Sequence, residues 1–311
     1  MEVETSCSED NREVPIPSNG IDSDSIVPCV SLAQAERFCR RLATTHYENF
    51  LVASIFLPRR MRQPFYTVYA FCRHADDLAD HSPTPEIATK KLLAWRRQLA
   101  DCFSGEATHP IFIALRAITG RFNLRIDPFD KLLTAFLQDQ SKVSYQDFDE
   151  LLDYCQYSAN PVGRIVLRLA DADSDHNVRL SDSICTGLQL VNHWQDVARD
   201  FHAGRVYLPK DDAKRFAVDL EVLDCSDQRQ RFCRLIQFQC ERSSVFLQDG
   251  LSLPNQVPRW LANDIRLFVH GGLATLEAIA RVDYDVLKVR PKVSRFKQMR
   301  LLAAATFGRL A

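Results

Sequence analysis

The sequence predicts an all-α fold built as one domain. Apolar residues recur at steps of three and four from about residue 31 onward, which is the spacing of amphipathic helices. Prolines and glycines divide the chain into segments of helical length, and the sequence has no series of alternating strand patterns and no repeat of fixed period. A chain of 311 residues can also bury a large apolar core. We therefore expect a single helical bundle.

The breaks in the pattern set the expected helix ends. Pro64 and Gly105 interrupt the apolar pattern, and Gly204 suits a helix stop. Pro258 marks the start of the last long segment. The clearest helical segments cover about residues 31–57, 64–80, 86–103, 145–169, 181–202, 228–249 and 259–288.

The two ends of the chain differ in charge from the rest. Residues 1–30 contain seven acidic groups, one base and no apolar period, which predicts a disordered acidic extension before a helical domain at 31–311. Residues 288–311 contain seven Lys or Arg and no acid, so this stretch is suited to bind diphosphate or an anionic membrane surface.

Composition excludes several classes of protein. The net charge of −1 gives no basic excess for a nucleic-acid partner. Ten cysteines without a CxxC pair argue against a zinc or thioredoxin-like site. The start of the chain does not resemble a signal peptide, and no apolar run reaches the roughly 20 residues of a membrane span. We expect a cytoplasmic protein, either free or peripheral on the inner membrane face.

A first group of acidic residues lies in the segment PFYTVYAFCRHADDLAD, residues 64–80. A helix turns about 100° per residue, so Tyr69, Arg73, Asp76 and Asp80 fall within about 60° of one face. Two carboxylates one turn apart repel each other unless a cation lies between them, and oxygen ligands without His or Cys favour Mg²⁺. On its own this pattern is also that of a solvated acidic face.

A second acidic stripe lies in an otherwise apolar segment, GLQLVNHWQDVARDFHAGRVYLP. Asn192, Asp196 and Asp200 stand four residues apart and cover about 80° of a helix. Arg205 and Tyr207 follow the expected helix stop and can reach the same pocket, where a guanidinium suits phosphate oxygens. Because Mg²⁺ takes part of its ligands from substrate phosphates, the two stripes together favour a shared metal site for a diphosphate ester.

These two segments resemble the aspartate motifs of the squalene and phytoene synthase family, which joins prenyl diphosphates head to head. A third segment, YCQYSANPVGRIVL at 154–167, is similar to the family's helix that breaks near a Val-Gly pair. The stretches HYENF, SANPVG and NHWQD are most similar to the bacterial hydroxysqualene synthase branch of hopanoid biosynthesis. The resemblance implies an isoprenoid synthase-like helical bundle around a central cavity.

The resemblance also implies roles for individual residues. It assigns Mg²⁺ binding to Asp76, Asp80, Asn192, Asp196 and Asp200. It assigns contact with the diphosphate or its surroundings to Tyr69, Arg73, Arg205, Tyr207 and Arg266. Substrate binding is expected to involve His46, Asn49, Phe50 and Gln189 as well, with His46 and Asn49 as candidates for positioning water.

The reaction implied for this branch is that of a carbon–oxygen lyase. Presqualene diphosphate would lose diphosphate, and water would capture the rearranged cation to give hydroxysqualene. The expected partner is a presqualene diphosphate synthase, which would supply the substrate. The first alternative is a prenyltransferase that makes presqualene diphosphate, squalene or phytoene from farnesyl or geranylgeranyl diphosphate. Two further alternatives are a helical adaptor without catalysis and a His-Asp phosphohydrolase, which would need His74 as a ligand.

Overall fold

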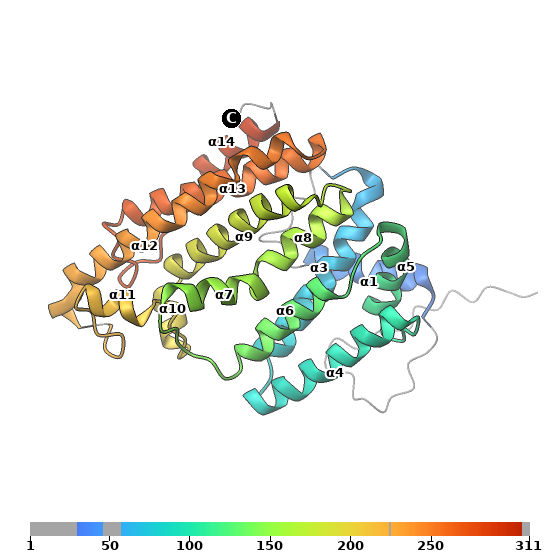
Figure 1. Cartoon of the computed structure of the whole chain (residues 1–311), viewed down its shortest axis with the longest axis horizontal. Coiled ribbons are helices and arrows are strands. Elements are labelled where there is room, and N and C mark those ends of the chain that lie inside the picture. The colour runs from blue at the N-terminus through green and yellow to red at the C-terminus, as the bar shows by residue number, and fades with distance from the viewer. Residues whose placement is uncertain (1–29, 46–56, 224, 307–311) are drawn as a thin grey trace, which may run out of the picture.

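The computed structural model describes residues 30–45, 57–223 and 225–306 (Figure 1). The α-helices in these ranges are α1 (Leu32–Thr45), α3 (Arg59–Asp80), α4 (Pro85–Ser104), α5 (Pro110–Phe122), α6 (Asp127–Gln138), α7 (Phe148–Ser158), α8 (Asn160–Leu169), α9 (Asp175–Gln195), α10 (Val197–His202), α11 (Lys210–Arg215), α12 (Arg229–Asp249), α13 (Arg259–Ala280) and α14 (Arg295–Thr306). Two 3₁₀ turns complete them, η1 (Ser226–Gln228) and η2 (Gly250–Asn255).

The predicted all-α class is confirmed. Over the described ranges the sole β-type pairing is an isolated parallel bridge between Ser144 and Val206. The acidic extension and the end of the first predicted helix, residues 46–57, lie almost wholly outside the described residues.

Several helix ends differ from the prediction for local reasons. The segment 145–169 divides at Ala159, just before Pro161, which has no N–H to continue a helix. The segment 259–288 stops at Ala280, because Asp283 and Tyr284 adopt left-handed φ values of 53° and 61°.

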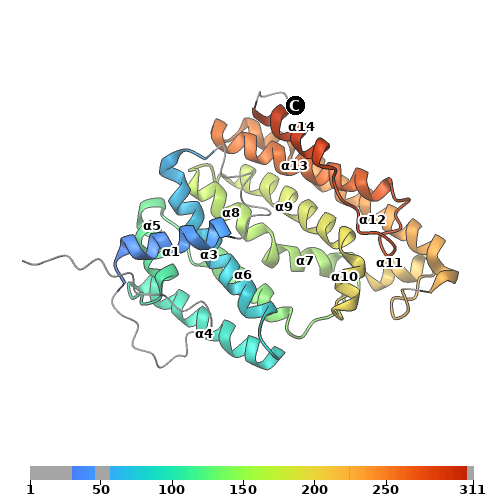
Figure 2. The same ribbon diagram turned by 180° about the vertical axis from the view of Figure 1, so that it is seen from behind.

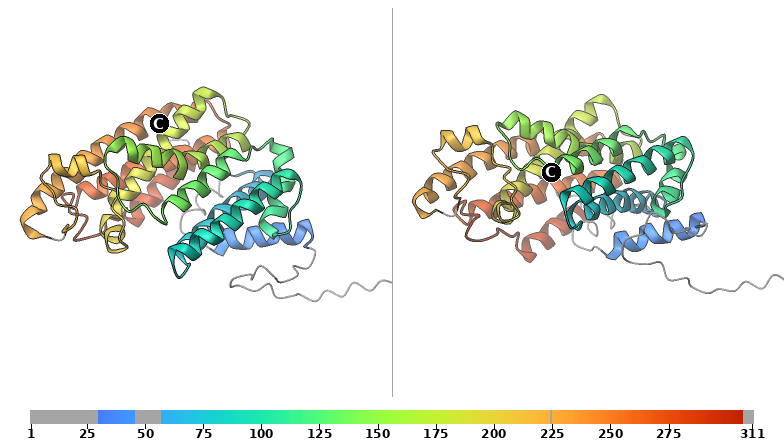
Figure 3. Two further views of the ribbon diagram at one scale, coloured as in Figure 1. Left: turned by 60° about the horizontal axis from the view of Figure 1, so that its bottom comes forward. Right: turned by 90° about the horizontal axis from the view of Figure 1, so that it is seen from below.

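The helices pack around two apolar cores that lie side by side (Figures 1 and 2). One core is built mainly from α1, α3, α4, α5 and α6, and the other mainly from α7, α9, α12 and α13. Helix α8 contributes to both, and the half-buried Trp260 packs against both. Figure 3 shows the same division from two further directions. The two predicted aspartate groups therefore belong to different halves of the bundle, on α3 and at the end of α9.

Helices α8 and α9 approach each other closely at Gly163. A Cβ atom added there would lie 2.3 Å from the Ser181 hydroxyl oxygen and 2.7 Å from the Cys185 sulfur. Only glycine allows this contact without a shift of the neighbouring side chains. The glycine of the SANPVG segment thus sets the distance between the helix that joins the two halves and the helix that carries Asp196.

The interior contains one carboxyl group that is poorly matched to its surroundings. Asp264 on α13 is 2% exposed, and both of its carboxylate oxygens lack a hydrogen-bond partner among the described residues. Burial raises the pKa of Asp264 to about 8. The carboxyl group therefore prefers its neutral form, and ionisation costs stability.

We expect Asp264→Asn to stabilise the fold, with a gain that grows with pH. The pKa is about 8 in the folded chain and roughly 4 in an unfolded chain. The folded state thus holds a proton that the unfolded state releases, and wild-type stability falls by up to about 1.4 kcal/mol per pH unit between these values. Thermal unfolding of both proteins at pH 5 and pH 8 measures the effect. An equal difference in Tm at the two pH values would contradict it.

Candidate active site

The last turns of α3 carry three carboxylates and one arginine. Nη1 of Arg73 lies 3.2 Å from Asp76 Oδ2, and its Nη2 lies 2.7 Å from Asp77 Oδ1. Asp80 is the last residue of the helix, one turn beyond Asp76. Burial and then the nearby Asp80 carboxylate raise the pKa of Asp76. This helix end thus holds more negative charge than Arg73 neutralises.

The second acidic stripe does not lie on one continuous helix. Helix α9 ends at Gln195, Asp196 has non-helical angles (φ −108°, ψ 13°), and α10 begins at Val197. The break turns Asp196 and Asp200 relative to the exposed side chain of Asn192. The sequence pattern missed this break because no proline or glycine marks it.

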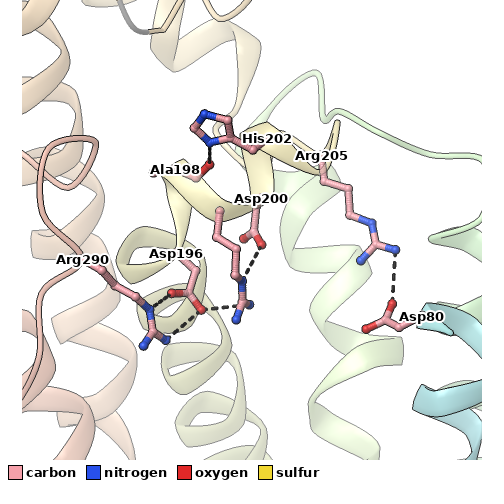
Figure 4. Close-up of polar contacts among 8 residues, drawn as sticks. Asp80, Asp196, Ala198, Asp200, His202, Arg205 and Arg290 are labelled. Atoms are coloured by element: carbon pink, nitrogen blue, oxygen red, sulfur yellow. Dashed lines mark hydrogen bonds and ion pairs between the residues drawn. The ribbon is translucent and has the colours of Figure 1, made fainter.

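Asp196 is 7% exposed and is held by arginines from two segments (Figure 4). Arg290 donates to both carboxylate oxygens, and Nη2 of Arg199 lies 2.9 Å from Oδ2. The amide of Gln195 donates to the carbonyl oxygen of Pro291 at 2.7 Å, which fixes the Arg290 segment beside the site. Part of the basic end of the chain therefore belongs to this site.

Arg205 connects the two aspartate groups. Its Nη2 lies 3.4 Å from Asp80 Oδ1 on α3, while its own segment follows α10 (Figure 4). Gly204 has a φ of 77°, as expected for a helix stop, and the Val206 N–H donates to the Val143 carbonyl oxygen at 2.8 Å. The backbone on both sides of Arg205 is thereby fixed, so the guanidinium is directed across the gap between the halves.

Asp139 is a further acidic residue at this junction, and the sequence analysis did not identify it. The Tyr154 hydroxyl donates to Asp139 Oδ2 at 2.9 Å. Burial raises the pKa of Asp139 to about 6, although the Tyr154 hydrogen bond and the Arg205 charge oppose the shift. Asp139 follows the end of α6 and belongs to no periodic pattern, so only the tertiary structure brings it to the site.

Aromatic rings close the site on the side of α9. The Tyr207 ring stacks on His193 at 3.7 Å between centroids and on Tyr145 at 5.7 Å. Burial lowers the pKa of His193 to about 3, so the imidazole is neutral. A small pocket beside these rings is also lined by Asp200 and Arg205. The polar groups thus meet an aromatic wall.

Comparison with known proteins identifies this arrangement. The family model described as squalene/phytoene synthase matches residues 43–297, which include both aspartate segments and the Tyr154 helix. The chain belongs to the squalene/phytoene synthase family. The predicted resemblance is therefore confirmed, and with it the family's processing of prenyl diphosphates.

Some relatives of this chain are named hydroxysqualene synthase and others phytoene synthase. A hydroxysqualene synthase of Sinorhizobium fredii is 34% identical over 211 residues, 68% of this chain and 71% of that protein. One from Rhodopseudomonas palustris is 31% identical over 87% of this chain and 91% of its own length. A phytoene synthase of Arthrospira platensis is 28% identical over 89% of this chain and 96% of its own length.

Solved structures of the family have the same fold. A squalene synthase, HpnC, from Alicyclobacillus acidocaldarius has a TM-score of 0.78 and 40% sequence identity, and the match covers 82% of this chain and 96% of that one. A dehydrosqualene synthase with bound ligand has a TM-score of 0.80 at 24% identity, over 89% of this chain and 97% of that one. The second likeness concerns the fold alone.

The acidic groups have the chemistry of a Mg²⁺ site. Burial raises the pKa of Asp200 to about 6. The Asp196 carboxylate adds to this shift, and the positive charge of Arg199 opposes it. Burial also raises the pKa of Asp76, so each group would gain from a nearby cation. In the described ranges no three His, Cys, Asp or Glu side chains already converge as a metal site. The donors at hand, carboxylate oxygens on separate helices without His or Cys, are nevertheless of the type that Mg²⁺ prefers.

The structure places the remaining predicted residues in different positions. Tyr69 lies on α3 one turn before Arg73, and Gln189 lies half-buried on α9 one turn before Asn192. Arg266 lies on α13, and its Nη2 donates to Asn255 in η2 rather than to a residue of this group. His46, Asn49 and Phe50 lie outside the described residues.

His74 does not join the aspartates either. Its ring packs against Trp95 at 4.3 Å and against His109 at 5.3 Å between centroids, inside the core of α3, α4 and α5. Burial lowers the pKa of His74. A phosphohydrolase site with His74 as a metal ligand is therefore not supported by this packing.

We expect Arg290→Gln to destabilise the protein by about 1–3 kcal/mol, because it removes a charged partner from the buried Asp196. Adding Asp196→Asn should recover part of this loss, with a coupling free energy of at least about 0.5 kcal/mol. Urea unfolding measures both values. Arg281→Gln is the matched control, since Arg281 is 65% exposed and its partner Glu277 51% exposed, and it should change stability by less than about 0.5 kcal/mol. Equal effects of Arg290→Gln and Arg281→Gln would contradict the assignment.

Proposed function

We propose that the chain is a hydroxysqualene synthase, a lyase that releases diphosphate from presqualene diphosphate and lets water capture the rearranged cation. The observation that carries this proposal is the ion pair of Arg205 with Asp80, which brings the two aspartate groups to one place. The 40% identity with the squalene synthase HpnC and the two relatives named hydroxysqualene synthase support the choice within the family. A presqualene diphosphate synthase would then have to supply the substrate.

Mg²⁺ would be held by carboxylates from both halves. Asp76 and Asp80 would contribute from α3, and Asn192, Asp196 and Asp200 from α9 and α10. Bound there, Mg²⁺ would withdraw electron density from the diphosphate and so favour breakage of the carbon–oxygen bond.

The protein's own cations complete the charge balance. Arg73 and Arg205 lie beside the α3 carboxylates, and Arg290 lies beside Asp196. Guanidinium groups can exchange these carboxylates for phosphate oxygens, since both present pairs of oxygen acceptors that match the planar fork of N–H donors. They would thus neutralise the negative charge that develops on the leaving diphosphate. The Tyr207, His193 and Tyr145 rings would restrict water near this end.

A product assay tests the proposal. Incubation of the protein with Mg²⁺ and presqualene diphosphate, without a nicotinamide, should release diphosphate and an alcohol. The relatives named phytoene synthase favour the runner-up, a prenyltransferase that makes presqualene diphosphate, squalene or phytoene. Unreacted presqualene diphosphate together with consumption of farnesyl or geranylgeranyl diphosphate would establish that alternative.

Asp76→Asn and Asp196→Asn should each lower the rate of diphosphate release by about 100-fold or more, because each removes a charge that holds Mg²⁺. Release of diphosphate, measured with a coupled phosphate assay, gives the rate. Asp211→Asn is the control, because Asp211 lies on the exposed surface of α11 and accepts a hydrogen bond from the Gln146 side chain. This substitution should leave the rate within about twofold of wild type. A wild-type protein that turns over no prenyl diphosphate would instead favour the adaptor alternative.

We also propose that α14 places the protein at an anionic membrane surface. Phe296 is 70% exposed and Met299 is 68% exposed, and the sequence has no acidic residue after Asp285. Lys292, Arg295 and Arg300 surround these apolar side chains in the sequence. Among the described helices none is long and apolar enough to cross a membrane. A basic surface with exposed apolar side chains suits peripheral contact with anionic lipid.

Replacing both Phe296 and Met299 by Ser should reduce partition to vesicles that contain anionic lipid by about fivefold or more, since apolar insertion is lost. Co-sedimentation with anionic and neutral vesicles measures the change. The control is Val222→Ser with Val245→Ser, because both valines are 53% exposed but lie away from α14. If the two double variants partition equally, α14 is not the contact surface.

A further inference from the structure

Asp264 differs from the other buried carboxylates of the bundle. Asp196 is paired with two arginines, and Asp212 accepts hydrogen bonds from Gln239 and Arg242. Asp264 is more deeply buried than either, at 2% exposed, yet neither oxygen has a partner among the described residues. A buried carboxyl that is costly to the fold and unpaired is a candidate for binding a small polar molecule.

The face of α13 that carries Asp264 leads from a closed to an open region. Trp260, Asp264, Phe268, Gly271 and Thr275 lie within about 80° of one face. At the start of this face the Trp260 ring contacts Phe65 of α3, with 5.9 Å between centroids. Farther along, Phe268 is 39% exposed, and a Cβ atom on Gly271 would meet no atom within 4 Å. Asp264 thus lies between a packed aromatic contact and free space.

The same contact places Asp264 relative to the aspartates. On α3, Phe65 precedes Asp76 by eleven residues, which is about 16 Å along a helix. Helix α13 runs from the Trp260 contact towards the other end of the bundle, where the following segment brings Arg290 to Asp196 (Figure 2). Asp264 is one turn along this path, between the Trp260 contact and the end of α13 that leads to the Arg290 segment. That is the region where the hydrocarbon part of a prenyl diphosphate would lie.

We propose that Asp264 binds the water molecule that captures the carbocation and accepts the proton that this water loses. This inference rests on the proposed function. Diphosphate leaves with the electron pair of the broken carbon–oxygen bond, and the substrate cation rearranges. A lone pair of the water then forms the new carbon–oxygen bond, and one proton passes from the water oxygen to an Oδ atom of Asp264.

The surroundings of Asp264 suit this role. An apolar wall excludes other water, so one bound molecule is positioned while the rest of the cation is protected. Burial raises the pKa of Asp264 to about 8, so the ionised carboxylate is the minor form at neutral pH, grows as the pH approaches 8, and is a stronger base than an ordinary carboxylate. A nearby cation would favour that ionised form further.

The test measures two quantities for each variant: the rate of diphosphate release from presqualene diphosphate with Mg²⁺, and the ratio of alcohol to hydrocarbon in the product. Asp264→Leu removes the water site, and Asp264→Asn removes the proton acceptor. In both we expect diphosphate release within about threefold of wild type and a fall of about tenfold or more in the alcohol ratio, as the cation loses a proton from a neighbouring carbon instead. Asp264→Glu should restore most of the alcohol.

Thr275→Val is the matched control, because Thr275 lies on the same face and its hydroxyl already donates to the Gly271 carbonyl oxygen. It should leave the alcohol ratio unchanged. An unchanged ratio in Asp264→Leu or Asp264→Asn would overturn the proposal, as would a lower Tm in both, which would indicate a structural role. A wild-type protein that releases no diphosphate would instead contradict the proposed function, so the two failures are distinguished by the first measurement.

Discussion

The repulsion between carboxylates at the junction of two apolar cores is the constraint on which this structure depends. Asp76 and Asp80 come from one half, and Asp196 and Asp200 from the other. Without cations, the burial of Asp196 and Asp200 next to each other would be unfavourable. Arginines from separate segments supply the compensation, namely Arg73, Arg199, Arg205 and Arg290. The charge balance of the site is therefore also part of what joins the halves.

These arginines hold the site in a form that is ready for exchange. On the α3 side both partners of each ion pair are partly exposed: Arg73 and Asp76 are 28% and 41% exposed, and Arg205 and Asp80 are 32% and 50% exposed. Exposed pairs of this kind contribute little to stability, because water and salt screen them. Under the proposed function, a diphosphate with its divalent ions would thus replace these internal pairs at small cost. By contrast, Asp196 is almost fully buried, so its side of the site is more rigid.

The sequence was sufficient for the parts of the site that follow a helical period. The spacing of Arg73, Asp76 and Asp80 places them on one face of α3, because successive side chains on a helix have fixed angles. The fold class followed from the same period. Gly204 was predicted as a helix stop because a left-handed residue favours glycine, and its φ of 77° agrees.

Other features could not be predicted because they depend on contacts between distant segments. Asp139 becomes part of the site only through Tyr154, and Arg290 only through Asp196. The break at Asp196 has no local signal, since Gln195 is instead held by Pro291, almost one hundred residues later. The partner of Arg266 also depends on tertiary structure, since its guanidinium donates to Asn255 in η2 and to no residue of the aspartate groups.

The contrast between Asp196 and Asp264 indicates that the bundle keeps its arginine-paired carboxylates apart from the region that we propose for the carbocation. At the mouth, acidic groups are matched by arginines, so charge can be exchanged with a polyanionic substrate. Deeper in the bundle, Asp264 is the carboxyl for which the described residues offer neither a cation nor a donor. Natural selection tolerates such a destabilising group mainly where it serves function. In the proposed role the unpaired oxygens of Asp264 hold one water beside the substrate, whereas the Asp196 oxygens are already engaged by Arg290 and Arg199.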